Sequence, residues 1–102
     1  MTDLFAPYQL GPFTLPNRLV MAPLTRNRTG VGEAPTELAA QYYAQRASAG
    51  LIITEGTQPS AVGQGYPHTP GLHSEEQVAG WRLVADAVHA KGGTLAIGSA
   101  HV

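Results

Sequence analysis

Apolar residues along this chain fall into short runs that predict strands, separated by segments with helical spacing. Residues 8–15 form two short alternating runs around Gly11-Pro12, a pattern typical of a β-hairpin. Residues 19–22 and 51–54 are continuous apolar or near-apolar runs. Such runs indicate strands covered on both faces, as in a parallel sheet. A third strand of this kind begins at residues 94–97.

The first helical segment follows Thr36, which is a plausible N-cap. Leu38 and Tyr42 follow at helical spacing, and the pattern continues through Gln45-Arg46. We expect the helix to end near Gly50, in the left-handed conformation that closes many helices.

The second helical segment begins with a capping box, in which Ser74 is the N-cap and Gln77 the third helical residue. Gly92-Gly93 ends the segment. Its apolar stripe consists of Val78, Trp81, Val84, Ala85 and Val88.

This order predicts an α/β fold, with an N-terminal β-hairpin followed by β-α-β-α-β and a parallel sheet. A doubly wound nucleotide-binding fold should show a glycine cluster directly after its first strand. The first strand instead runs into Pro23-Leu24-Thr25-Arg26. A long Gly- and Pro-rich loop, residues 58–73, follows the second strand. A barrel places its chemistry on such loops, so the pattern favours part of a TIM (β/α)₈ barrel.

Composition narrows the class of protein further. The 102 residues suit one domain, 1–102, and 43% hydrophobic with 13% charged residues indicates a folded chain. A net charge of −1 gives no reason to expect nucleic acid as a partner. No apolar run is long enough to span a membrane, and the start lacks a signal-peptide pattern. With no cysteine, we expect a cytoplasmic protein. The four histidines lack the spacing of a metal site.

Five collinear stretches resemble the Old Yellow Enzyme family and together cover nearly the whole chain. The first of them runs from Asn17 to Arg26. The other four are residues 42–47, residues 50–56, residues 63–67 with 69–71, and residues 88–93.

The resemblance implies a (β/α)₈ barrel that binds FMN and reduces activated alkenes such as enones with NAD(P)H. It also implies that Pro23, Leu24 and Thr25 lie against the flavin, with the Thr25 hydroxyl donating to the C4 carbonyl. Such a donor stabilises negative charge on the reduced ring. Gly56 corresponds to a position where flavin approaches the backbone, and Tyr66 to an aromatic residue at the substrate mouth.

Each of these residues also has a purely structural interpretation. Thr25 suits a turn or cap, Gly56 suits a strand end with an unusual φ, and Tyr66 suits packing inside an Ω-like loop. We expect Tyr42 and Tyr43 to pack the first helix. We expect Arg26 and Arg28 to form surface ion pairs, with a place near the flavin side of the barrel left open.

The resemblance breaks at the third strand, where the family has a flavin-binding glutamine and this chain has Gly98-Ser99-Ala100-His101. The other parts of the family's site lie beyond Val102. We therefore expect the isolated chain to be inactive, and to pair with a complementary barrel chain or to self-associate. The alternative is a non-catalytic flavin-binding or structural barrel fragment.

Overall fold

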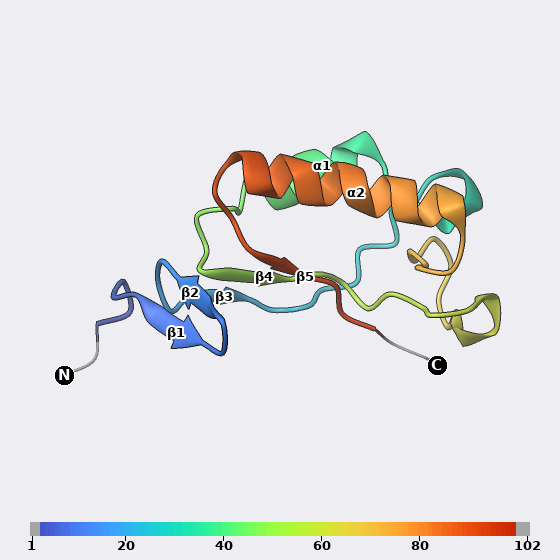
Figure 1. The fold of residues 1–102 in the computed structure, drawn as a ribbon. Helices are drawn as coiled ribbons and strands as arrows, with labels where there is room; N and C mark the ends of the chain where they lie inside the picture. The colour runs from blue at the N-terminus through green and yellow to red at the C-terminus, as the bar shows by residue number, and fades with distance from the viewer. Residues whose placement is uncertain (1–2, 100–102) are drawn as a thin grey trace.

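The computed structural model describes residues 3–99, which form two small sheets. An antiparallel hairpin joins β1 (Tyr8–Leu10) to β2 (Phe13–Leu15). Three parallel strands, β3 (Val20–Met21), β4 (Leu51–Ile53) and β5 (Leu95–Ala96), lie in the order β3-β4-β5. The hairpin lies beside one end of the parallel sheet (Figure 1). The predicted hairpin and β-α-β-α-β order are therefore confirmed.

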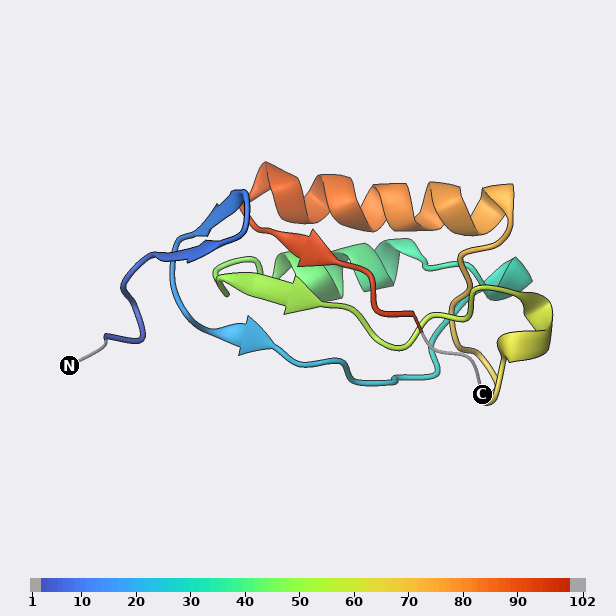
Figure 2. The same cartoon turned by 60° about the horizontal axis from the view of Figure 1, so that its bottom comes forward.

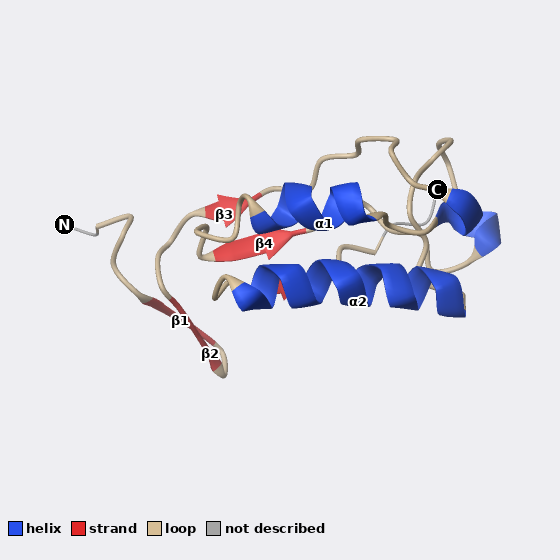
Figure 3. Ribbon diagram, turned by 90° about the horizontal axis from the view of Figure 1, so that it is seen from above, coloured by secondary structure: helices blue, strands red, loops and turns tan. Residues whose placement is uncertain are grey.

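Both long helices, α1 (Glu37–Ala44) and α2 (Glu75–Ala90), cover the same face of the parallel sheet (Figures 1 and 2). They run side by side when seen from above (Figure 3). Two short 3₁₀ helices, η1 (Val31–Glu33) and η2 (Ala61–Gly63), lie in the loops after β3 and β4. Within residues 3–99, one helical layer thus covers one face of the parallel sheet, and the other face has no helix over it.

Local sequence signals determine where both helices begin. The Thr36 side chain accepts a hydrogen bond from the backbone N–H of Ala39, so it caps α1 as predicted. Ser74 and Gln77 form the predicted capping box at the start of α2. These caps satisfy backbone donors that no helical carbonyl can reach.

The predicted end of α1 is wrong. The helix ends at Ala44, short of Gln45-Arg46, and Gly50 does not have a positive φ. A Cβ atom at Gly50 would overlap the carbonyl oxygen of Asn17, so close backbone approach requires glycine there. The glycine that does adopt a positive φ after a helix is Gly92, which follows α2 and has a φ of 78°.

The core lies between the two helices and the sheet. Trp81, Val84 and Val88 are buried, as the α2 stripe predicted, but Val78 is 43% exposed and that part of the prediction is wrong. Ala85 is half-buried. The remaining members of the core cluster are Ala39, Ala40, Tyr43, Ala47 and Ile52.

The opposite face of the sheet is apolar and largely uncovered in this chain. Ile52 points into the core and is fully buried, whereas Val20 is 52% exposed. Leu51 and Ile53 are half-buried on either side of Ile52. A hollow of about 390 Å³ lies between this face and the hairpin; it is lined by Tyr8, Leu10, Leu15, Arg18, Val20, Leu51 and Ile53. The continuous apolar strands are therefore covered on one face only.

Candidate functional site

The carboxyl ends of β3, β4 and β5 meet at one edge of the sheet, because the three strands are parallel. In the β3–β4 register Val20 lies opposite Leu51 and Met21 opposite Ile52. The paired residues end there, but by count along the same register Thr25 corresponds to Gly56. Both positions, to which the resemblance assigns flavin contact, line one cavity.

A small cavity of about 60 Å³ joins three of the predicted site residues: Thr25, Gly56 and Tyr66. Pro23 and Leu24 do not line it; both are exposed beside it on the chain. The other residues that line the cavity are Gln58, Gly63, Gly65 and Thr69.

Tyr66 is 60% exposed, so its side chain does not pack inside the long loop. Its backbone oxygen accepts hydrogen bonds from the Gln64 side chain at 3.1 Å and from the Thr69 hydroxyl at 2.9 Å. The loop backbone therefore fixes the position of Tyr66 and leaves its ring free at the cavity.

Two buried side chains, Gln58 and Thr69, close the base of this loop, and no sequence pattern selected either of them. Gln58 Nε2 donates to the Thr69 carbonyl at 2.9 Å, and the Thr69 hydroxyl shares its one hydrogen between the Tyr66 carbonyl at 2.9 Å and Gln58 Oε1 at 3.2 Å. The backbone N–H of Gln58 also bonds the Pro70 carbonyl. This reciprocal pairing satisfies both buried side chains and gives the loop a fixed base.

Gly98 lies two residues after β5 and forms hydrogen bonds with the segment that follows β4. Its N–H donates to Thr54 Oγ1 at 3.0 Å, and its carbonyl accepts from the Thr57 N–H at 2.8 Å. A Cβ atom here would lie 3.1 Å from the Thr54 carbonyl oxygen. Gly98 thus brings no side chain to the edge. Ser99 pairs with Thr57 in an isolated parallel bridge, and the last two residues of the departure, Ala100 and His101, lie outside the described residues.

The expectation of ordinary surface ion pairs for Arg26 and Arg28 is wrong. Arg26 Nη2 lies 2.8 Å from Glu55 Oε2, and the two side chains are only 15% and 5% exposed. Arg28 donates to the backbone carbonyls of Arg26 and Asn27 instead. The Arg26–Glu55 pair is the single ion pair between side chains of residues 3–99.

Tyr43 belongs to the same cluster as well as to the core. Its hydroxyl donates to Glu55 Oε2 at 3.2 Å and accepts from the Glu55 backbone N–H at 3.1 Å. Burial raises the pKa of Tyr43 to about 12, and the neighbouring Glu55 carboxylate contributes in the same direction. Tyr43 therefore packs α1 as predicted, and in addition holds the carboxylate that pairs with Arg26.

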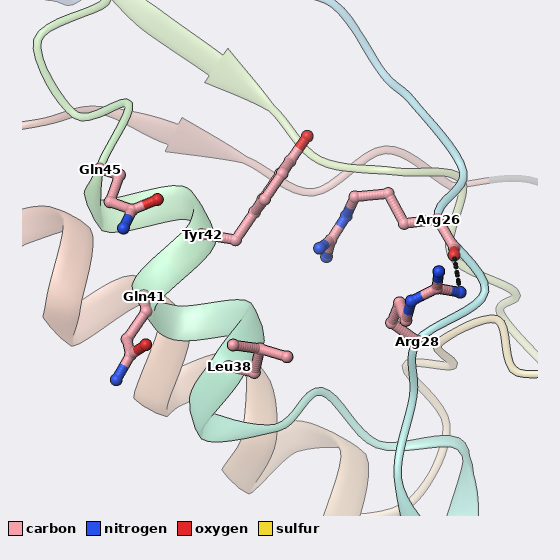
Figure 4. A pocket seen from close by; sticks show the side chains of 6 residues that line it. All are labelled: Arg26, Arg28, Leu38, Gln41, Tyr42 and Gln45. Carbon is pink, nitrogen blue, oxygen red and sulfur yellow. Dashed lines mark hydrogen bonds between the residues drawn. The ribbon is translucent and has the colours of Figure 1, made fainter.

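A hollow of about 420 Å³ lies outside this cluster, next to α1 (Figure 4). The Arg26 guanidinium faces the Tyr42 ring there, with Cζ 3.8 Å from the ring centroid. The buried Nε of Arg26 has no hydrogen-bond partner among the described residues. The full lining is Arg26, Arg28, Leu38, Gln41, Tyr42 and Gln45.

Residues 3–99 contain no cluster of candidate metal ligands and no candidate membrane-spanning helix. In this part of the chain no three His, Cys, Asp or Glu side chains are placed to hold a metal ion. Neither helix described there has the length and apolar character needed to cross a membrane.

The described residues fit one wall of a flavin site. Pockets that bury a drug-sized ligand measure about 300–1,000 Å³, far more than the small cavity at Thr25. The wall offers an exposed hydroxyl at Thr25, a backbone without a side chain at Gly56, and an exposed apolar side chain at Leu24. That combination suits the edge of a planar ring with carbonyl groups. Because residue 98 is glycine, that position has no side-chain amide to hydrogen-bond the ring.

The fold and this edge define a class: the first part of a parallel β/α barrel whose strand ends form one side of a ligand site. Residues 3–102 match the model of the NADH:flavin oxidoreductase / NADH oxidase family, and the chain belongs to that family. This confirms the Old Yellow Enzyme resemblance and FMN as the cofactor of the family.

Relatives of known structure match the fold closely. A morphinone reductase in complex with tetrahydroNAD superimposes with a TM-score of 0.96 at 53% identity, covering 100% of this chain and 28% of that one. An Old Yellow Enzyme homologue from Zymomonas mobilis gives 0.95 at 48% identity, covering 99% and 28%. The predicted partial TIM barrel is thereby confirmed.

Curated relatives show the same limited coverage. The 12-oxophytodienoate reductase 7 of Oryza sativa subsp. japonica is 52% identical over 91 residues, which is 88% of this chain and 23% of the relative. The chanoclavine-I aldehyde reductase of Penicillium roqueforti is 48% identical over 94 residues, which is 90% and 26%. The chain therefore spans about a quarter of the length of these relatives.

The raised pKa of Tyr43 predicts a stability loss in alkaline solution. The neutral phenol is favoured in the folded state, so its contribution is complete below the ordinary pKa of 10.0 and is lost as pH rises toward about 12. Across that range the free energy of unfolding should fall by about 2 kcal/mol. Urea titrations at several pH values above and below 10.0 measure this change. Tyr43→Phe should remove most of the slope; an equal slope in both proteins would contradict the assignment.

Proposed function

We propose that this chain is the N-terminal part of an FMN-dependent ene-reductase, which reduces activated C=C bonds, such as those of enones, with NAD(P)H. The observation that carries the proposal is the convergence of Thr25, Gly56 and Tyr66 on one cavity at the carboxyl ends of parallel strands. In (β/α)₈ barrel enzymes this is the end where active sites lie.

The relatives support the substrate class. Three of them are named for reducing morphinone, 12-oxophytodienoate and chanoclavine-I aldehyde, and each of these names denotes a carbonyl compound. A carbonyl conjugated to an alkene withdraws electrons from it and makes its β-carbon a hydride acceptor. One relative binds tetrahydroNAD, which supports a nicotinamide as the source of reducing equivalents.

The chemistry that FMN supplies when bound is the relay of hydride from NAD(P)H to the alkene. In this proposal Pro23 and Leu24 contact the ring, and Thr25 donates its hydroxyl hydrogen to the C4 carbonyl. Gly56 leaves room for the ring to approach the backbone. Tyr66, exposed and fixed by its loop, contacts the substrate at the mouth of the site. We also propose a cytoplasmic location, which the lack of cysteine suits.

A complete barrel tests the proposal. We would join residues 3–99 to the rest of the morphinone reductase barrel and measure NADH and NADPH oxidation with 2-cyclohexenone. The joined protein should bind FMN and turn over, whereas the isolated chain with added FMN should not. A folded barrel that binds FMN without turnover would support the alternative of a non-catalytic flavin-binding module. One that folds without binding FMN would support the structural alternative.

Thr25→Ala in the same barrel tests the role of the hydroxyl. A hydrogen bond to a group that gains charge contributes about 1.5–3 kcal/mol, so kcat should fall roughly 10- to 150-fold. Thr14→Ala, an exposed hairpin threonine, is the matched control and should leave kcat unchanged. Equal rates for the two variants would remove Thr25 from the reaction.

We further propose that the uncovered sheet face binds the remaining barrel strands. Two hollows of about 390 and 440 Å³ lie over this face, both lined largely by apolar side chains and both including Leu51. In a closed barrel, inward side chains of the other strands fill this space. A second copy of the chain is the alternative occupant, and it would give self-association.

Sedimentation of the isolated chain tests this partner proposal. Each large apolar side chain left in water forfeits about 1.5–3 kcal/mol. The chain alone should therefore sediment as a concentration-dependent mixture, and a complementary barrel chain should convert it to one heterodimeric species. A single monomeric boundary at every concentration, with or without that chain, would show that the face needs no partner.

A further inference from the structure

We propose that Arg26 is a positioning residue for the reaction: its ion pair with Glu55 holds Thr25 in register with Gly56. The inference rests on the proposed function, because it concerns how the flavin wall is assembled. Arg26 directly follows Thr25 in the chain, and Glu55 directly precedes Gly56. A contact between these two side chains therefore joins the two residues of the wall.

Backbone pairing does not provide this alignment. The β3–β4 ladder ends at Met21 and Ile52, before either wall residue is reached. Among the hydrogen bonds of residues 3–99 outside the strand ladders, residues 22–28 are joined to the chain after β4 only through the Arg26 side chain. The next anchor is the Thr29 N–H, which donates to the His68 carbonyl. The alignment of Thr25 thus depends on a side-chain link.

That link is held from both ends. Glu55 is 4% exposed and receives the Tyr43 hydroxyl on the same Oε2 that Arg26 contacts. The Arg26 guanidinium lies over the Tyr42 ring, with Cζ 3.8 Å from the ring centroid (Figure 4). An arginine fixed by a carboxylate and by an aromatic face has little rotamer freedom. The backbone at Arg26, and with it Thr25, is therefore fixed relative to helix α1.

If the ion pair only stabilised the fold, its loss would lower the melting temperature without acting through Thr25. The two roles are separated by a double-mutant cycle in the flavin-loaded complete barrel, with Arg26→Met, Thr25→Ala and the combination. If Arg26 acts by placing the Thr25 hydroxyl, its loss should lower kcat by about 10-fold in the presence of Thr25. In the Thr25→Ala background it should have almost no further effect on kcat.

The same cycle has readouts besides activity. Arg26→Met and Thr25→Ala should both lower the reduction potential of bound FMN, because a donor to the ring favours its reduced, anionic form. Arg46→Met is the matched control, since Arg46 lies over the same Tyr42 ring but has no carboxylate partner within residues 3–99. It should leave the potential and kcat unchanged. Arg26→Lys, which keeps the charge and loses the planar fork, replaces Arg26→Met if that variant does not fold, and should give an intermediate loss.

The outcomes are distinguishable. If the unmodified barrel binds no FMN or reduces no enone, the proposed function fails, and the positioning role of Arg26 in that reaction is overturned with it. If the unmodified barrel is active and the effects of Arg26→Met and Thr25→Ala multiply, Arg26 acts independently of Thr25 and the positioning role is overturned. An FMN potential that moves equally in Arg26→Met and Arg46→Met overturns it as well.

Discussion

The packing of α1 and α2 against one face of the three-stranded sheet is the interaction on which the rest of the structure depends. It buries Ile52 completely, together with Trp81 and Val88, while Val20 on the other face stays half exposed. Because burial of apolar surface is the main favourable term in folding, this single layer supplies most of the stability that the chain has by itself. The uncovered face is the physical reason why the chain suits a larger barrel.

The core and the candidate site share a residue, Tyr43. Its ring packs with Trp81, at 6.2 Å between ring centroids, while its hydroxyl holds the Glu55 side chain at the strand end. The helix layer thus determines where a carboxylate lies at the edge of the sheet, and that carboxylate determines where Arg26 lies. One aromatic side chain and one ion pair thus connect the core to the strand ends that carry Thr25 and Gly56, the wall of the proposed flavin site.

The sequence predicts those features whose causes are local. Thr36 and the Ser74–Gln77 box cap helices through contacts within one turn, and Gly11-Pro12 forms the hairpin loop with its neighbours. The family motifs selected Thr25, Gly56 and Tyr66, which line one cavity in the structure; their contacts with flavin and substrate stay predictions.

Features with distant partners could not be predicted in this way. Arg26 and Glu55 are separated by 29 positions, and nothing near Arg26 in the chain indicates a buried carboxylate. Gly50 resembles a helix-ending glycine, but its role depends on the approach of Asn17 from the segment before β3. Gln58 and Thr69 likewise read as ordinary loop residues until the fold pairs them.

We propose that the strand ends carrying Thr25 and Gly56 form one wall of an FMN site. A crystal structure of the complete barrel containing residues 3–99, with FMN bound, would show where the flavin lies. We expect the flavin ring to lie against Pro23, Leu24 and Gly56, with its C4 carbonyl within hydrogen-bonding distance of the Thr25 hydroxyl. A flavin bound elsewhere on the barrel, with Thr25 and Gly56 facing solvent or protein alone, would contradict it.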